Sequence, residues 1–254
     1  MKIKKGVILL GGLGKRFFPL SKILPKELFP FGRKPLLQWI VEEGKSAGIE
    51  KFIFVLSKEK KEIFKKFAKL FLKDVIFKVC FQKEPRGDGD AILKAKRFIK
   101  KGENFFVFFG DDISFGKVSM AKEMVDFFKK EKKSPLLCLK KVKKEKISSY
   151  GCPEVEKIKN KFFLIKKIIE KPEISKAPSN FAIVGKYILP SKIFQFLESA
   201  PLRKNELILA SALNLMIKKE NKIYGKEVSA EWLECGTPDK WQESLCKLKI
   251  QIEN

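Results

Sequence analysis

The sequence contains no histidine, and none of its five cysteines belongs to a CxxC pair. Structural zinc sites and disulfide frameworks depend on grouped cysteine or histidine residues, so we expect neither in this chain. The lack of histidine also excludes catalytic triads in which an imidazole takes the proton of the nucleophile. Chemistry based on charge neutralisation by carboxylates, lysine and arginine remains open.

Long apolar runs are absent as well. No segment approaches the roughly 18 apolar residues that a helix needs to cross a bilayer. The first residues, MKIKKGVILLGG, lack the small-residue cleavage site of a secretory signal. We therefore expect a cytoplasmic protein with no membrane partner. A chain of 254 residues with 44% hydrophobic content can bury the core of one domain.

Arginine is scarce although the chain is strongly basic. Five arginines stand among 55 cationic residues, and the formal net charge is +25. Such a charge could indicate nucleic-acid binding, but recognition of bases favours arginine, and the lysines are spread along the whole chain. Specific nucleic-acid binding is therefore the weaker interpretation, and compositional drift of the source genome explains the excess of lysine.

The densest set of functional signals lies between Val7 and Phe31. Val7–Leu10 is an apolar run typical of a buried strand. The glycines after it allow the backbone to approach a ligand and to direct its N–H groups at phosphate oxygens. Prolines oppose helix in the loop that follows. A polyphosphate site is predicted from three glycines, Gly11, Gly12 and Gly14, and four cations, Lys15, Arg16, Lys22 and Lys26.

The spacing excludes two common phosphate loops. The segment has no GxxxxGK[ST] signature, and Phe17 occupies the place of the last glycine in a GxGxxG fingerprint. The alternative that needs no function is an ordinary turn with solvated lysines.

Apolar runs alternate with amphipathic segments over the first half of the chain. This alternation predicts βαβ units around a largely parallel sheet that is covered on both faces. Ligands of such sheets bind at the carboxyl ends of the strands, and Gly11, Gln82 and Asp111 each lie at such an end. We expect strands at 7–10, 51–57, 75–81, 104–109, 135–142, 162–169, 181–189 and 223–228. We expect helices at 35–48, 59–72, 117–131, 190–199 and 205–219, with a further helix that begins near residue 88 and a last one that ends near residue 252.

The segment GGLGKRFFPLSKILPKELFPFGRKP resembles the signature of the sugar-1-phosphate nucleotidyltransferases, and most of all that of the bacterial UTP:glucose-1-phosphate uridylyltransferases. The positions that match are Arg16, Pro25, Lys26, Glu27, Pro30, Lys34 and Pro35. The resemblance extends over nearly the whole chain. It implies an α/β fold, a Rossmann-like three-layer α/β/α sandwich with a mostly parallel mixed sheet. It also implies one domain, 1–254, with a nucleotide-binding half at about 1–145 and a sugar-binding half at about 146–254.

In this family a phosphate oxygen of a sugar 1-phosphate attacks the α-phosphorus of a nucleoside triphosphate and expels pyrophosphate. Such a transfer requires positioning and charge neutralisation rather than a nucleophile from the protein. The resemblance therefore implies Mg²⁺ as cofactor, with UTP and glucose 1-phosphate as substrates. It assigns catalytic roles to Arg16, Lys26 and Asp111, and it assigns the metal to Asp111 and Glu234.

The resemblance also implies two sets of binding residues. In the family the glutamine amide and the glycine backbone form hydrogen bonds to the edge of the pyrimidine base. The implied nucleotide-binding residues are Leu10, Gly11, Gly12, Gly14, Lys15, Gln82 and Gly87. The implied sugar-phosphate-binding residues are Gly151, Glu170, Lys171, Asn180 and Val184.

Several positions depart from the family pattern. Lys15 replaces a threonine, Glu234 replaces an aspartate, and Ala210 and Ser211 replace a threonine and an aspartate. The chain is also shorter than its bacterial relatives near Leu72 and at its C-terminus. Because these regions often form subunit contacts, the sequence leaves open whether the protein is a homo-oligomer.

Two alternative functions remain. A thymidylyl- or cytidylyltransferase acting on glucose 1-phosphate or another sugar 1-phosphate would keep the same reaction, since Gln82 and Gly87 suit uracil and thymine alike. A non-catalytic nucleotide or nucleic-acid binder on the same fold is the weaker alternative, suggested by the net charge and by Ser211 and Glu234. Without the motif, Asp111 and Asp112 would be interpreted as a turn or a helix N-cap.

Overall fold

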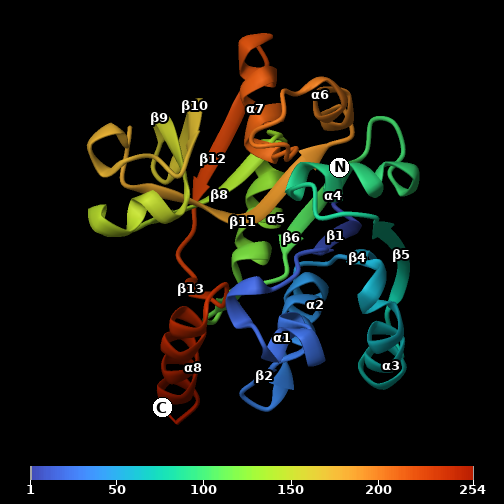
Figure 1. Cartoon of the computed structure of the whole chain (residues 1–254). Coiled ribbons are helices and arrows are strands. Elements are labelled where there is room, and N and C mark those ends of the chain that lie inside the picture. Colours follow the sequence, from blue (N-terminus) through green and yellow to red (C-terminus); the bar gives the residue numbers. More distant parts are fainter. Residues whose placement is uncertain (1, 254) are drawn as a thin grey trace.

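The structure is a computed structural model that describes residues 2–253. Nine strands of the described chain form the central sheet (Figure 1). Their spatial order is β5 (Ile76–Gln82), β4 (Lys51–Ser57), β1 (Lys5–Leu10), β6 (Asn104–Phe109), β11 (Phe181–Pro190), β8 (Leu136–Lys141), β12 (Ile223–Glu227), β10 (Phe162–Glu170) and β9 (Gly151–Lys159).

The sheet is mixed. The four strands β5, β4, β1 and β6 are parallel to one another, and β8 and β12 form another parallel pair. Strand β11 is antiparallel to both of its neighbours, and β10 is antiparallel to β12 and β9. The structure confirms the expected mostly parallel mixed sheet.

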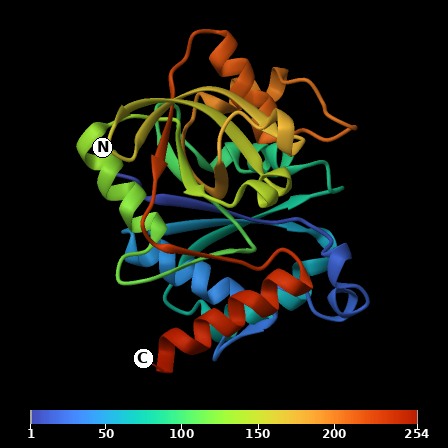
Figure 2. The same ribbon diagram turned by 90° about the vertical axis from the view of Figure 1, so that its left-hand side faces the viewer.

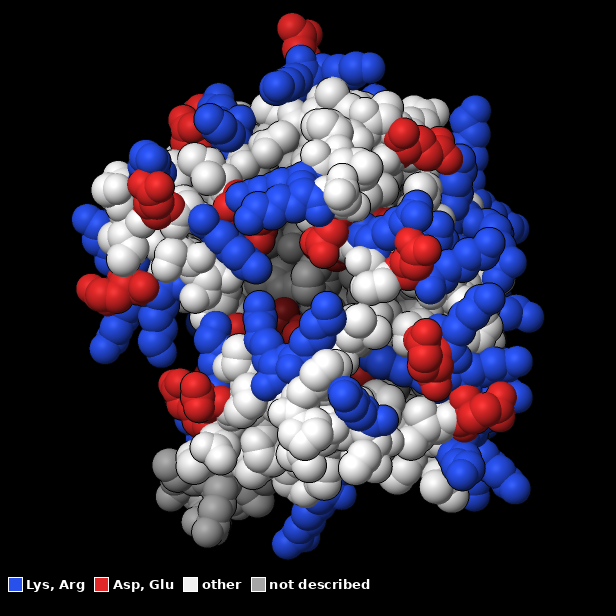
Figure 3. All heavy atoms as spheres, viewed as in Figure 1, with Lys and Arg blue, Asp and Glu red and all other residues white. Residues whose placement is uncertain are grey.

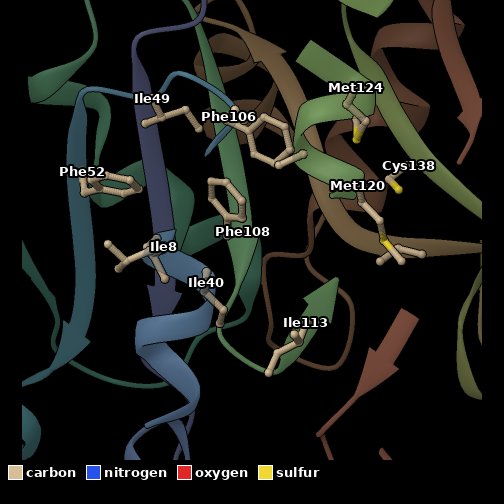
Figure 4. Packing of buried hydrophobic residues seen from close by; sticks show 14 of the residues in the cluster. Ile8, Ile40, Ile49, Phe52, Phe106, Phe108, Ile113, Met120, Met124 and Cys138 are labelled. Carbon is tan, nitrogen blue, oxygen red and sulfur yellow. The ribbon is translucent and has the colours of Figure 1, made fainter. Parts of the chain in front are cut away.

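Helices cover both faces because successive side chains of a strand enter different cores. In β6, Phe106 and Phe108 belong to one core (Figure 4), whereas Phe105 and Val107 belong to the other. The sheet therefore lies between two helical layers (Figures 1 and 2). The first core is covered by α2 (Leu36–Ser46), α3 (Lys61–Phe71), α5 (Met120–Glu131) and α8 (Pro238–Glu253), and the second by α4 (Asp88–Lys94), α6 (Ile193–Ser199) and α7 (Leu209–Lys218).

Short elements complete the chain. Strands β7 (Asp112–Phe115) and β13 (Glu231–Glu234) form an antiparallel pair, as do β2 (Pro30–Phe31) and β3 (Lys34–Pro35). Among the described residues, no helix has the length and apolar character needed to cross a membrane. The remaining elements are α1 (Leu20–Ile23) and the 3₁₀ helices η1 (Lys15–Phe17), η2 (Lys26–Leu28), η3 (Lys58–Lys60), η4 (Lys96–Phe98), η5 (Lys144–Ser149) and η6 (Ile174–Lys176).

The structure corrects the sequence-based prediction in two respects. The prolines of residues 11–34 predict a loop without helix, whereas this segment contains η1, α1 and η2. Pro19 and Pro25 immediately precede α1 and η2, where a proline at the start of a helix is tolerated. The sequence also gave no prediction of β7, β9 or β13, because these strands lack a continuous apolar run.

The carboxyl ends of β1, β5 and β6 meet at one edge of the sheet, as the parallel pairing requires. Gly11 follows β1, Gln82 is the last residue of β5, and Asp111 lies two residues beyond β6. The sequence-based prediction that these three residues lie at strand ends is confirmed.

The packing of α2 generates a prediction about stability. Leu37 is fully buried in the first core, so Leu37→Ala should lower the free energy of unfolding by about 2–5 kcal/mol in a denaturant titration. Leu70→Ala on α3 is the matched control, because Leu70 is 66% exposed, and it should cost less than about 1 kcal/mol. Equal losses in the two variants would contradict the assignment of the core.

Candidate active site

Two cavities adjoin at the carboxyl edge of the sheet. The first has a volume of about 270 Å³ and lies at the ends of β1, β5 and β6. The second has a volume of about 260 Å³ and is lined by residues of β9, β10 and β11. Asp88, Phe109 and Asp111 line both cavities, so the cavities share a wall. The face of the molecule in Figure 3 is hollowed near its centre, with cationic side chains around the recess and acidic atoms within it.

Two positions at the first cavity have no room for a side chain and are occupied by glycine. A Cβ on Gly11 would lie 2.3 Å from the Gln82 Oε1 atom, and a Cβ on Gly87 would lie 2.3 Å from the carbonyl oxygen of Leu207. Gly87 also has a φ of 94°, which favours glycine. The Gln82 Nε2 atom donates to the Gly87 carbonyl oxygen at 3.0 Å and to Asp90 Oδ2 at 2.8 Å. The structure therefore brings Gly11, Gln82 and Gly87 together in the first cavity, and their role in nucleotide binding stays a prediction.

Lys60 anchors the glycine loop from the end of β4. Its ammonium donates to the carbonyl oxygens of Leu10 at 2.7 Å and Gly12 at 2.6 Å. It also pairs with the buried carboxylate of Glu27 at 3.1 Å. The sequence predicts a helix at 59–72 but does not predict that Lys60 reaches the glycine loop, because no local signal distinguishes Lys60 from the lysines around it.

The rest of the opening segment is more exposed. Gly14 has a φ of 64°, and its carbonyl oxygen accepts a hydrogen bond from Ser21 Oγ at 2.7 Å. Lys15 and Arg16 are both exposed. Arg16 lines the second cavity, and its charge helps to lower the pKa of Asp111. Arg16 is thus placed to act on an anion in that cavity.

An ion pair occupies the junction of the two cavities. The Lys26 Nζ atom lies 2.5 Å from Asp111 Oδ2. Burial disfavours both charges, but each offsets the penalty of the other, so the pKa of Lys26 is raised and the pKa of Asp111 is lowered. Burial, together with the charge of Asp111, raises the pKa of Asp112 to about 7.

Asp112 lines the second cavity, but hydrogen bonds also connect it to neighbouring parts of the fold. Its Oδ1 atom accepts from the Trp232 indole N–H at 2.6 Å, and its Oδ2 atom accepts from the Gly185 N–H at 3.1 Å. The fully buried Lys186 donates to the Asp112 carbonyl oxygen at 2.7 Å and lies 3.3 Å from Glu43 Oε2. These contacts fix the backbone that presents Asp111.

A second carboxylate approaches Asp111 from β13. Glu234 accepts hydrogen bonds from the Tyr150 hydroxyl and from Lys240 Nζ, both at 2.6 Å. The nearest oxygens of Asp111 and Glu234 lie 3.3 Å and 3.9 Å from the point that a Cβ on Gly236 would occupy. The two carboxylates predicted to hold a metal therefore face the same space.

Three predicted sugar-phosphate residues line the second cavity. Gly151 begins β9 and pairs with Glu170, the last residue of β10. A Cβ on Gly151 would lie 3.0 Å from Glu170 Oε2, and burial raises the pKa of Glu170. Lys171 also lines this cavity, and its backbone N–H donates to the Tyr150 carbonyl oxygen at 3.0 Å.

The structure does not bring the other two to the cavity. Asn180 is exposed, and Val184 is fully buried in the first core. Because side chains alternate along β11, its residues Ile183, Gly185 and Tyr187 line the cavity instead. A Cβ on Gly185 would lie 2.2 Å from Asp112 Oδ2, so this position requires glycine.

Asp88 is a half-buried carboxylate that was not among the site residues predicted from the sequence. Its Oδ1 atom accepts from the backbone N–H groups of Gly89 at 2.7 Å and Leu209 at 2.9 Å. Burial raises the pKa of Asp88 to about 6, with a further contribution from the charge of Glu170. The folded chain therefore holds a proton on Asp88 at a higher pH than the unfolded chain does.

A pH-dependent stability follows from this shift. The contribution of Asp88 to the stability of the fold should decrease as the pH rises from about 4 to about 6, through the interval between the ordinary pKa of 3.8 and the raised value. At pH 7, Asp88→Asn should raise the free energy of unfolding by about 1–3 kcal/mol, and the gain should shrink toward pH 4. Denaturant titrations at both pH values measure it. The exposed Asp126→Asn is the control, and a gain of the same size there would refute the assignment.

The sequence matches a described family over nearly its whole length, residues 5–250, that of nucleotidyl transferases. A UTP–glucose-1-phosphate uridylyltransferase of Staphylococcus saprophyticus is 35% identical over 93% of this chain and 89% of that relative. The protein of the same name from Staphylococcus epidermidis is 33% identical over 99% of this chain and 92% of that relative.

Solved structures give the same result. A UDP-glucose pyrophosphorylase in complex with UDP-glucose superposes with a TM-score of 0.90 at 29% identity, covering 98% of this chain and 99% of that chain. A UTP-bound UGPase from Acinetobacter baumannii superposes with a TM-score of 0.85 at 26% identity, covering 98% and 94%. These matches confirm the fold and the resemblance inferred from the sequence. The chain belongs to the nucleotidyl transferase family.

Proposed function

We propose that this chain transfers the uridylyl group of UTP to glucose 1-phosphate and releases pyrophosphate. The observation that carries the proposal is the junction of two cavities at Asp111, because a nucleotide in the first and a sugar phosphate in the second would meet there. Relatives that carry the name of this activity, and a similar structure that holds UDP-glucose, support it.

The hydrogen bonds of Gln82 favour uracil in the first cavity. Its Nε2 atom donates to the Gly87 carbonyl oxygen and to Asp90, and both partners accept only. The amide orientation is thereby fixed, and Oε1 is left as an acceptor. Uracil and thymine present an N–H donor at N3, whereas cytosine presents an acceptor there. UTP and dTTP should therefore bind better than CTP.

The carboxylates at the junction suit Mg²⁺. This ion takes oxygen ligands and is commonly held by one or two carboxylates together with substrate phosphates. Asp111 and Glu234 face one space, and no group of three or more metal-ligating side chains occurs among the described residues. This arrangement fits an ion that enters with the triphosphate, with Asp111 and Glu234 as its protein ligands. Bound there, Mg²⁺ would neutralise charge on the phosphate oxygens.

The protein's own part in the reaction is to position the reactants and to neutralise charge. An oxygen of the sugar phosphate forms a bond to the α-phosphorus of UTP as the bond to the leaving pyrophosphate breaks. Arg16 lies at the second cavity, where it would contact the attacking phosphate, and Lys26 lies at the junction. A fixed cation that meets charge developed in the transition state lowers the barrier. Gly151, Glu170 and Lys171 would hold the sugar phosphate.

The substrates can be identified by measuring pyrophosphate release from UTP, dTTP, CTP and ATP with glucose 1-phosphate and other sugar 1-phosphates. We expect the largest kcat/KM for UTP with glucose 1-phosphate, no turnover after chelation of Mg²⁺, and poor use of CTP. A maximum with dTTP would favour the thymidylyltransferase alternative. Folded protein that releases no pyrophosphate with any pair of substrates would contradict the proposed enzymatic activity.

The assembly state and the cytoplasmic location of the protein stay predictions from the sequence.

Arg16 can be tested separately. Arg16→Ala should lower kcat by a factor on the order of 10² or more while changing the KM for glucose 1-phosphate far less, because its charge acts mainly in the transition state. Arg33→Ala is the matched control, since Arg33 is an exposed arginine of the same opening segment that lines neither cavity. A change of KM equal to the change of kcat would remove Arg16 from a catalytic role.

A further inference from the structure

The wall between the two cavities is made where the start of α4 meets the start of α7. The Leu207 N–H donates to the Arg86 carbonyl oxygen at 2.8 Å, and the Gly89 N–H donates to the Leu207 carbonyl oxygen at 2.9 Å. The Leu209 N–H donates to Asp88 Oδ1 at 2.9 Å. A Cβ on Gly89 would lie 2.9 Å from the Leu207 carbonyl oxygen, so the two segments are in close contact.

Asp88 replaces a missing helix cap. The N-cap residue of α7 is Ile208, and it has no side-chain hydrogen bond to the helix. The first N–H groups of a helix need acceptors, which an N-cap side chain usually supplies. Here one of them is supplied by Asp88, which lies on a different helix. The capping bond and the bond from Gly89 both end on Oδ1.

The Asp88 carboxylate forms part of the wall and also lies close to residues of the second cavity. Asp88 interacts electrostatically with Glu170 and Tyr187. Both of these residues line the second cavity, and neither lines the first. Asp88 also lines the second cavity, and the hydrogen bonds from the Gly89 and Leu209 N–H groups both use Oδ1 rather than Oδ2.

A cap alone does not require this charge. A neutral asparagine or serine caps a helix about as well as aspartate does. Burial of the ionised carboxylate disfavours the folded state at neutral pH, as its raised pKa shows. A destabilising charge retained in a cavity is typical of a residue that contacts a ligand.

We propose that Asp88 is a specificity-determining residue of the second cavity. Its Oδ1 holds α7 in place, and its Oδ2 accepts a hydrogen bond from a hydroxyl of the bound hexose. This inference rests on the proposed function for the identity of the sugar. It concerns recognition of the hexose, however, and binding of the product tests it without turnover.

The test compares the affinities of UDP and UDP-glucose by calorimetry in the wild type, in Asp88→Leu and in Asp88→Asn. A hydrogen bond to a charged group is worth about 1.5–3 kcal/mol, so Asp88→Leu should weaken UDP-glucose binding by about 10- to 100-fold. The affinity for UDP should change by less than about threefold, because UDP lacks the hexose. Asp88→Asn keeps the cap and loses the charged acceptor, so it should weaken UDP-glucose binding by about 5- to 10-fold.

Analogues of UDP-glucose that each lack one hydroxyl identify the contact. One of them should bind to the wild type about as weakly as UDP-glucose binds to Asp88→Leu, and it should be insensitive to that substitution. Equal losses for UDP and UDP-glucose would show that Asp88 only shapes the wall, and unchanged UDP-glucose binding in Asp88→Asn would show that it only caps α7. Either result overturns the inference. Wild-type protein that binds UDP-glucose but releases no pyrophosphate would contradict the proposed activity alone.

Discussion

The functional site depends on the close approach of backbone segments at one edge of a parallel sheet. The ends of β1 and β6 are adjacent, and a Cβ on Gly110 would lie 2.8 Å from the Leu9 carbonyl oxygen. Gly11 and Gly185 instead leave room for side chains, because a Cβ there would lie 2.3 Å from Gln82 Oε1 and 2.2 Å from Asp112 Oδ2. A side chain at Gly110 would push the two strands apart, and side chains at Gly11 and Gly185 would displace Gln82 and Asp112 from their positions in the site. The edge can present backbone groups and carboxylates together only because these positions are glycine.

Two lysines stabilise this edge, the fully buried Lys186 and the partly buried Lys60. An isolated buried ammonium is costly, and it is tolerated when carboxylates and carbonyl oxygens satisfy it. Lys60 binds two carbonyl oxygens of the glycine loop and pairs with Glu27. Lys186 binds the Asp112 carbonyl oxygen and pairs with Glu43. The loops that follow β1 and β6 are thereby positioned before any substrate binds, which is the preorganisation that electrostatic catalysis requires.

The junction of the cavities is acidic although the chain carries a net charge of +25. Carboxylates close to one another repel, and the pKa of Asp112 rises to about 7 because Asp112 is buried beside Asp111. An acidic junction would also repel a triphosphate unless cations separate the charges. Lys26 and Arg16 supply part of that charge, and the proposed Mg²⁺ would supply the rest. The lysines and arginines around the recess in Figure 3 are placed to attract anionic substrates.

The sequence alone determined the parallel half of the sheet and the residues at its edge. Buried strands are continuous apolar runs, and glycines mark the places where a backbone must turn or approach another segment, so β1, β4 and β6 could be predicted with Gly11 and Asp111. The edge strand β5 is less buried, but its residues are apolar enough to predict it with Gln82 at its end. Only the tertiary structure decided the roles of Lys60, Asp88 and Lys186, because each depends on partners that lie far away in the sequence. It also decided that Gly185 rather than Val184 lines the second cavity. Alternate side chains of a strand face opposite sides of the sheet, and the pairing of the strands fixes which side becomes the site.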